Sequence, residues 1–197
     1  MGLRVYRIPF STNVERVALA AGHKGLAVEW IDVDPGDRSL VEAVSGQPLV
    51  PVLAAGDEVL ADSPRILDWL EAHHPDPPLL PADPARRAEV RIFCDWFNRV
   101  WKRAPNAIAD DGPTDALAAE MRAGVELFEA LLAGREYLFG EFGLADVTAF
   151  PFLKYAAFGV QPGDRDPFHR VLVDFIPLAG DSPLRAWANR VDAHPRS

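Results

Sequence analysis

Cysteine is the residue type that this chain has least of, since Cys94 is the only one among 197 residues. A single cysteine excludes an internal disulfide and a Cys-x-x-Cys redox pair. It also excludes a four-cysteine zinc site, and the five histidines show no metal-ligand spacing, so we expect no bound metal. We expect Cys94 itself to be a small buried apolar side chain.

The sequence also lacks long apolar runs and an excess of positive charge. No segment approaches the roughly 20 apolar residues that cross a bilayer, and the first ten residues show no signal-peptide pattern. Lysine and arginine number 20 against 29 aspartates and glutamates, for a net charge of -9, which argues against nucleic acid or an anionic membrane as a partner. We therefore expect a cytoplasmic protein that binds neither nucleic acid nor membrane.

What is present is an apolar content of 49%, enough for a buried core, and a pattern that changes near residue 75. Before that point strand and helix signals alternate, which predicts the order β-α-β-α-β-β-α. The predicted strands are Leu3–Ile8, Ala27–Val33, Val50–Leu53 and Glu58–Leu60. The predicted helices are a segment around residues 14–21 that ends at Gly22 and Gly25, then Arg38–Val44 and Ile66–His73.

A proline-rich segment separates this half from a second one. Five prolines lie within residues 74–84, so we expect residues 76–84 to be a linker between a domain of residues 1–75 and an all-α domain of residues 85–197. Helical spacing in the second half predicts helices over Ala85–Ile108, Thr114–Leu132, Leu144–Phe158, Pro167–Phe175 and Ser182–Ala193. Residues 144–158 are apolar on all sides, which predicts a buried helix.

The first candidate site is the junction of the first strand and first helix. Thr12 and Glu15 match the Ser/Thr-x-x-Glu capping box, which by itself explains both residues. The alternative is that a hydroxyl at this helix N-terminus, such as that of Ser11, donates a hydrogen bond to a bound anion. The helix dipole and the unpaired N–H groups would favour that anion and lower the pKa of a bound thiol.

Two further segments carry candidate binding residues. Pro51 either begins an edge strand or follows a cis peptide bond, which would leave the backbone of Val50 available to a peptide-like ligand. Ser63 is predicted to cap the next helix, with Pro64 at its first position. Capping does not require Asp62, whose carboxylate could instead bind a ligand ammonium group beside the helix N-terminus.

The order of these segments closely resembles the N-terminal domain of the cytosolic glutathione transferases. The matching features are a strand, a Ser-x-x-Val-x-Arg-Val helix, a Val-Pro-Val strand and an Asp-Ser-Pro helix. The resemblance implies an α/β thioredoxin-like thiol-binding domain followed by an all-α domain. It also implies that Ser11 activates the thiol of glutathione. The glutathione-binding residues that it implies are Thr12, Asn13, Val50, Pro51, Asp62 and Ser63.

The chain departs from the family at three positions. Leu49 stands where a basic residue often holds the glycyl carboxylate of glutathione, and Gln47 or Arg38 could replace it. Gly143 opens a segment that resembles the family's Ser/Thr-x-x-Asp capping motif, so Asp146 can accept the backbone N–H but lacks the reciprocal bond. Serine rather than cysteine at position 11 disfavours thiol-disulfide reduction.

The resemblance also implies where a second substrate binds, against the first long helix of the helical half. That helix carries Phe93, Trp96, Phe97 and Trp101, an aromatic stripe that could equally be core. We expect Phe10 and Trp96 to line the pocket for a small electrophile.

These features predict a glutathione transferase of the detoxification type, a homodimer by resemblance, that conjugates glutathione to a small hydrophobic electrophile. Two alternatives remain open at this point. One is a glutathione-dependent isomerase or dehalogenase of the same fold, and the other is a non-catalytic binding module that retains the fold.

Overall fold

A computed structural model describes residues 2–197, and its contacts divide the chain into two compact units. The first unit comprises Met1–Leu79 and His194–Ser197, and the second comprises Leu80–Ala193. The division thus differs at its C-terminal end from the expected one, in which residues 85–197 formed the helical domain.

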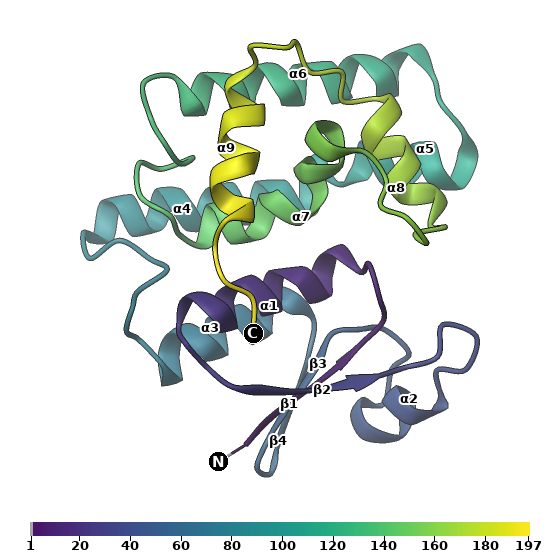
Figure 1. Ribbon diagram of the computed structural model, residues 1–197, viewed down its shortest axis with the longest axis vertical. Coiled ribbons are helices and arrows are strands. Elements are labelled where there is room, and N and C mark those ends of the chain that lie inside the picture. The colour runs from purple at the N-terminus through teal and green to yellow at the C-terminus, as the bar shows by residue number, and fades with distance from the viewer. Residues whose placement is uncertain (1) are drawn as a thin grey trace. The chain divides into compact units, whose positions relative to one another are not determined.

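The first unit is built on a four-stranded sheet (Figure 1). Its strand order is β2-β1-β3-β4, where β1 (Leu3–Arg7) pairs in parallel with β2 (Val28–Asp32) and antiparallel with β3 (Val52–Ala55). The edge strand β4 (Glu58–Ala61) follows β3 through a turn at Gly56, whose φ of +63° favours glycine. This is the thioredoxin-like arrangement that the sequence predicted.

Helices cover both faces of this sheet. The helices α1 (Thr12–His23) and α3 (Ser63–His73) pack against each other on one face, and α2 (Ser39–Ser45) lies on the other (Figure 1). A small core under α2 combines Tyr6, Val33, Val41, Val52 and Ala54. The helices α1 and α3 both begin at the same end of the sheet. The candidate residues that the motifs identified lie at that end as well.

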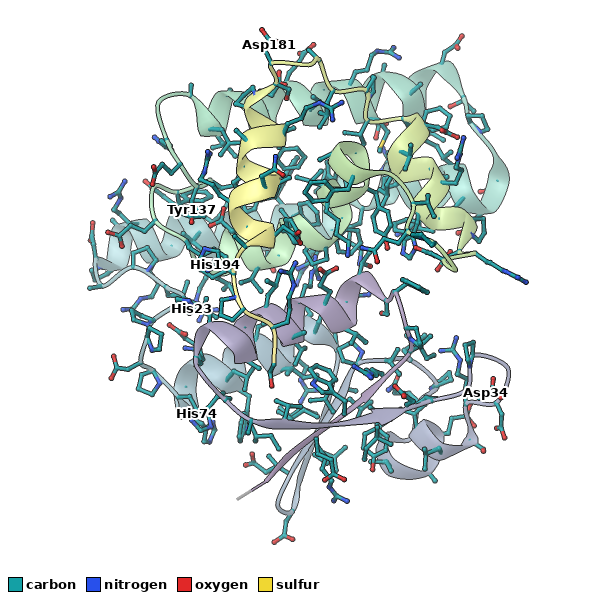
Figure 2. All side chains as sticks on the ribbon, viewed as in Figure 1. His23, Asp34, His74, Tyr137, Asp181 and His194 are labelled. Carbon is teal, nitrogen blue, oxygen red and sulfur yellow. The ribbon has the colours of Figure 1, made fainter. Side chains whose placement is uncertain are left out.

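The last residues of the chain pack against α1. The N–H of Ser197 donates to the carbonyl of Ala18 (3.1 Å), and Arg196 pairs with Glu15 (3.2 Å). His194 lies near His23, with ring centroids 6.4 Å apart (Figure 2). These contacts explain why residues 194–197 belong with the first unit rather than with the helices that precede them.

The first helix ends between the two glycines that were predicted to stop it. Gly22 was expected to stop it, yet α1 continues to His23. A Cβ atom on Gly22 would lie 2.2 Å from the carbonyl oxygen of Pro195, so a larger residue would collide with the C-terminal segment. Gly25, whose φ is +63°, follows the end of the helix as expected.

The second unit is all-helical. It contains α4 (Pro84–Trp96), a π-helical turn (Phe97–Trp101), α5 (Arg103–Asp111), α6 (Asp115–Leu132), α7 (Leu144–Phe158), α8 (Pro167–Asp174) and α9 (Pro183–Asp192). Every residue of α7 from Leu144 to Tyr155 is buried, and α7 packs against α4, α8 and α9. The prediction of a buried helix over 144–158 is therefore confirmed.

The helix predicted over Ala85–Ile108 is interrupted by the π-helical turn. There the rings of Phe97 and Trp101 stack with centroids 4.5 Å apart, and Trp101 is 5% exposed. A Cβ atom on Gly124 of α6 would lie 2.6 Å from the indole nitrogen of Trp101, so the bulky ring occupies space that only glycine leaves open. Cys94 in α4 is half-buried, with its sulfur 3.5 Å from the hydroxyl of Thr148.

Among residues 2–197, none of the helices combines the length and apolar content that crossing a bilayer requires.

Candidate functional site

A cleft of about 380 Å³ lies in the first unit, where the start of α1, the loop before β3 and the start of α3 meet. The residues that line it are Asn13, Gln47, Leu49, Val50, Pro51, Ala61, Asp62, Ser63 and Arg65. Five of the predicted glutathione-binding residues are among them, from three segments that are far apart in the sequence. Thr12 is buried and does not line the cleft.

The N-terminus of α1 is capped by Ser11. Its hydroxyl oxygen accepts the N–H of Val14 (3.4 Å), and its carbonyl accepts the N–H of Glu15 (3.0 Å). The predicted capping box of Thr12 and Glu15 is therefore wrong, because Thr12 is already the first helical residue. The carboxylate of Glu15 instead pairs with Arg196.

The Ser11 hydroxyl keeps its own hydrogen available while it caps the helix. Capping uses a lone pair of the oxygen, whereas donation to a sulfur or another acceptor uses the O–H. The residue before it, Phe10, has a φ of +65°, an unusual conformation for an aromatic residue, and is 38% exposed. Capping and anion binding are thus compatible at this position.

The loop before β3 presents backbone groups to the cleft. The Val50–Pro51 peptide bond is cis, the second of the two alternatives that the sequence left open, and β3 begins only at Val52. Within residues 2–197, neither the N–H nor the C=O of Val50 has a hydrogen-bond partner. A peptide-like ligand in the cleft could therefore pair with Val50.

The start of α3 differs from its prediction by one residue. Asp62 is the N-cap residue, since its carbonyl accepts the N–H of Ile66 (3.1 Å), and its side chain caps no N–H group. Its φ is +79°. Asp62 is thus, like Phe10, a non-glycine residue with a positive φ beside the start of a helix. Ser63 is the first helical residue, so the prediction that Ser63 caps α3 is wrong.

The hydroxyl of Ser63 is instead bound by α1. It donates to the side-chain oxygen of Asn13 (3.4 Å) and accepts from Nη1 of Arg16 (3.2 Å). The same Arg16 atom also donates to the Asn13 oxygen (3.2 Å). Arg16 and Ser63 are each 1% exposed. Sequence reasoning assigned Arg16 no role, although an arginine beside the apolar positions Val14 and Val17 could have drawn attention to it.

Gln47 and Arg38, which could have replaced a basic residue at position 49, instead make hydrogen bonds to nearby backbone groups. The Gln47 side chain bonds the backbone N–H and C=O of Leu49 (2.8 and 2.9 Å), and Arg38 donates to the carbonyls of Pro35 and Pro48 (both 3.1 Å). Leu49 is 67% exposed. The exposed side chain of Arg65, which sequence analysis did not single out, is the cation that lines the cleft.

Trp96, one of the two proposed pocket walls, lies in the helical unit. It is half-buried, and its ring centroid is 5.9 Å from that of Phe93 and 6.0 Å from that of Phe128. It therefore packs against the aromatic core of that unit. Whether Phe10 and Trp96 contact a substrate stays a prediction.

Asp146 anchors the start of α7 in the helical unit. Its carboxylate is fully buried and accepts the N–H groups of Leu138 (3.1 Å), Gly143 (3.0 Å) and the Trp187 indole (2.7 Å). Burial raises the pKa of Asp146 to about 6, against the opposing effect of these hydrogen bonds. The bond from Gly143 is the half of the capping motif that was predicted, and the bond from Trp187 was not foreseen.

Residues 2–197 contain no cluster of three or more histidine, cysteine or acidic side chains arranged to hold a metal ion. The polar groups that the lining residues bring to the cleft are a hydroxyl, two side-chain amides, a carboxylate, a guanidinium and backbone groups.

Comparison with known proteins gives matches of differing extent. A family model described as the N-terminal domain of glutathione S-transferase matches residues 5–78. Maleylpyruvate isomerase from Ralstonia sp is 33% identical, with 99% of this chain and 96% of that protein covered. Maleylacetoacetate isomerase from Pseudomonas aeruginosa is 32% identical over 80% of this chain and 84% of its own length.

Among solved structures, the tau-class glutathione S-transferase from mango superposes with a TM-score of 0.79. The alignment covers 98% of this chain and 90% of that one, with 19% sequence identity. This likeness concerns the fold, whereas the two isomerases extend the sequence relationship beyond the first unit.

Proposed function

Because the chain belongs to the glutathione S-transferase family, we propose that it binds glutathione in the cleft and uses the thiol to isomerise a small unsaturated acid. The observation that carries the proposal is the convergence of Asn13, Val50, Asp62 and Ser63 on one cleft. The two isomerases that align with most of this chain support isomerisation over conjugation, which sequence analysis had placed first.

The cleft offers complementary groups to each part of a γ-glutamyl peptide. The carboxylate of Asp62, which caps no helix N–H, is suited to the ligand ammonium group. The unpaired N–H groups at the start of α3 suit the neighbouring carboxylate. The N–H and C=O of Val50 suit the cysteinyl backbone, in the manner of an added strand.

Ser11 would act on the sulfur. Its O–H remains available while its oxygen caps α1, so it can donate to a thiolate at the helix N-terminus. The helix dipole and this hydrogen bond both favour the charged form, which lowers the pKa of the bound thiol from its usual value of about 8.5.

When bound, glutathione supplies a thiolate that adds to a double bond conjugated with a carbonyl and later leaves, so that the geometric isomer is released. The protein contributes binding of the peptide, orientation of the sulfur and the Ser11 hydrogen bond. The reaction consumes no glutathione, which separates it from conjugation.

The experiment compares wild type with two Ser11 variants. Ser11→Gly removes the hydroxyl but costs the helix cap only a few tenths of a kcal/mol, and Ser11→Thr keeps a hydroxyl. We expect calorimetry to show glutathione binding in all three proteins. The thiolate absorbance should give a lowered thiol pKa in wild type and Ser11→Thr but a pKa near 8.5 in Ser11→Gly. An unchanged pKa in Ser11→Gly would contradict the role of Ser11.

A product assay then separates the reaction types. With maleylpyruvate as the probe, isomerisation should proceed through many turnovers on less than one equivalent of glutathione. Consumption of one glutathione per molecule of an electrophile such as chlorodinitrobenzene, without isomerase activity, would indicate conjugation instead. Absence of glutathione binding would refute the proposal and favour a non-catalytic binding module.

We also propose that the chain acts in the cytoplasm as a homodimer, as the family resemblance implies. Light scattering after gel filtration measures the mass, which should be twice the 21.6 kDa of one chain.

A further inference from the structure

Arg16 is a permanently charged side chain buried directly behind the cleft. Only 1% of it is exposed, and it is not among the residues that line the cleft. Its Nη1 lies 3.2 Å from the side-chain oxygen of Asn13 and 3.2 Å from the hydroxyl of Ser63, and both of these residues do line it. A charge at this depth affects whatever binds in front of it, because screening by water is weak there.

The contact with Arg16 determines which way the Asn13 amide faces. A guanidinium group only donates hydrogen bonds, so the Asn13 atom beside it must be the oxygen. The Ser63 hydroxyl also donates to that oxygen (3.4 Å). The NH₂ group of Asn13 is therefore turned away from both donors, and within residues 2–197 it has no hydrogen-bond partner. This NH₂ group can therefore donate a hydrogen bond to a ligand.

The same contacts occupy the Ser63 hydroxyl. It accepts from Arg16 and donates to Asn13, so its hydrogen is already used. What Ser63 offers to the cleft is its backbone N–H at the start of α3. An acceptor with two oxygens, such as a carboxylate, could bind both this N–H and the Asn13 NH₂.

From these contacts we propose that Arg16 is a positioning residue that makes this end of the cleft selective for a carboxylate. It orients the Asn13 amide, holds Ser63 and places a positive charge behind the bound anion. This inference rests on the proposed function, in which the carboxylate is the α-carboxylate of the γ-glutamyl group. The cleft would bind glutathione much more tightly than a peptide that lacks only that group.

The test uses two ligands and two variants. The ligands are glutathione and γ-aminobutyryl-cysteinyl-glycine, which lacks the α-carboxylate but keeps the amine, the thiol and the glycine. Asn13→Asp keeps an oxygen acceptor for Arg16 but replaces the NH₂ donor with a second oxygen, so it should fold as wild type does. Arg16→Met removes the charge and the hydrogen bonds to Asn13 and Ser63 while retaining most of the side-chain volume.

In calorimetric titrations, each variant should lose about 10- to 100-fold in affinity for glutathione, the size expected for a hydrogen bond to a charged group. Affinity for the shorter peptide should change by less than about threefold, since the partner of the lost donor is absent. A general disturbance of the cleft would weaken both ligands alike. Thermal unfolding checks that each variant is folded. If Arg16→Met does not fold, the comparison of the two ligands is made with Asn13→Asp.

The outcomes separate the two proposals. Equal losses for both peptides, or no loss for glutathione, would overturn the role of Arg16 while leaving the glutathione site in place. Wild-type protein that binds neither peptide would refute the proposed function, and this inference with it.

Discussion

Replacing Asp146 with asparagine should change how the stability of the protein depends on pH. The carboxylate is fully buried, and its folded-state pKa is raised from 3.8 to about 6. Burial causes this increase, since moving the charged form out of water costs more than the hydrogen bonds from Leu138, Gly143 and Trp187 return. Asparagine has a similar shape but does not titrate.

The sign and size of the effect follow from proton linkage. Between pH 3.8 and about 6 the folded protein binds the Asp146 proton more tightly than the unfolded chain does. The contribution of Asp146 to stability is therefore fully present below pH 3.8 and is lost as the pH rises through about 6. At 1.36 kcal/mol per pKa unit, the loss amounts to about 3 kcal/mol. The asparagine variant does not undergo this loss.

Urea denaturation of wild type and Asp146→Asn at pH values from 4 to 7 measures this effect. The difference between their free energies of unfolding should shift by about 2 kcal/mol across this range, in favour of the variant at higher pH. The other carboxylates titrate in both proteins and cancel in the difference. A pH-independent difference would show that hydrogen bonding balances burial at Asp146, and a shift in favour of wild type as the pH rises would show that hydrogen bonding outweighs burial.

Three further substitutions test contacts that lie within one unit or the other. Trp187→Phe removes the shortest hydrogen bond to the buried carboxylate of Asp146, which should raise the pKa of that group further. In the same urea series, the variant should therefore lose the stability contributed by Asp146 at a higher pH than wild type does. Lys24→Met removes a fully buried ammonium group 2.7 Å from Glu71 and should lower the free energy of unfolding by about 3 kcal/mol, whereas a double variant that also carries Glu71→Leu should lose less. Gly22→Ala places a methyl group against the carbonyl of Pro195 and should release the C-terminal residues, which carboxypeptidase digestion would detect; equal digestion of both proteins would contradict this contact.

Much of the fold could be predicted from the sequence because its signals are local. The alternation of strand and helix patterns up to residue 73 and the apolar content of residues 144–158 each depend on neighbours in the chain. The start of α6 is an example, since Thr114 caps it by accepting the N–H of Leu117 (3.2 Å). The widened turn at Phe97–Trp101 could not be predicted, because helical spacing does not distinguish a π-helical turn from an ordinary one.

The order of motifs also led to most residues of the cleft, whereas their individual contacts were misjudged. Thr12 and Ser63 were both interpreted as caps because each begins a plausible capping sequence. In the structure the caps are one residue earlier, at Ser11 and Asp62. The hydroxyl of Ser63 does not cap α3, because it is bound by Arg16, 47 residues away in the chain.

The sequence by itself therefore determined the elements, their order and the family motif, which are properties of short segments. Tertiary structure alone decided which polar groups were used up and which stayed available to a ligand. The contacts of Arg16 with Asn13 and Ser63 could be identified only once α1 and α3 lay side by side. Asp146 likewise has a partner in Trp187, 41 residues further along the chain. A hydrogen-bonding group can be satisfied by any segment that folding brings within about 3 Å, and separation along the chain does not limit that choice.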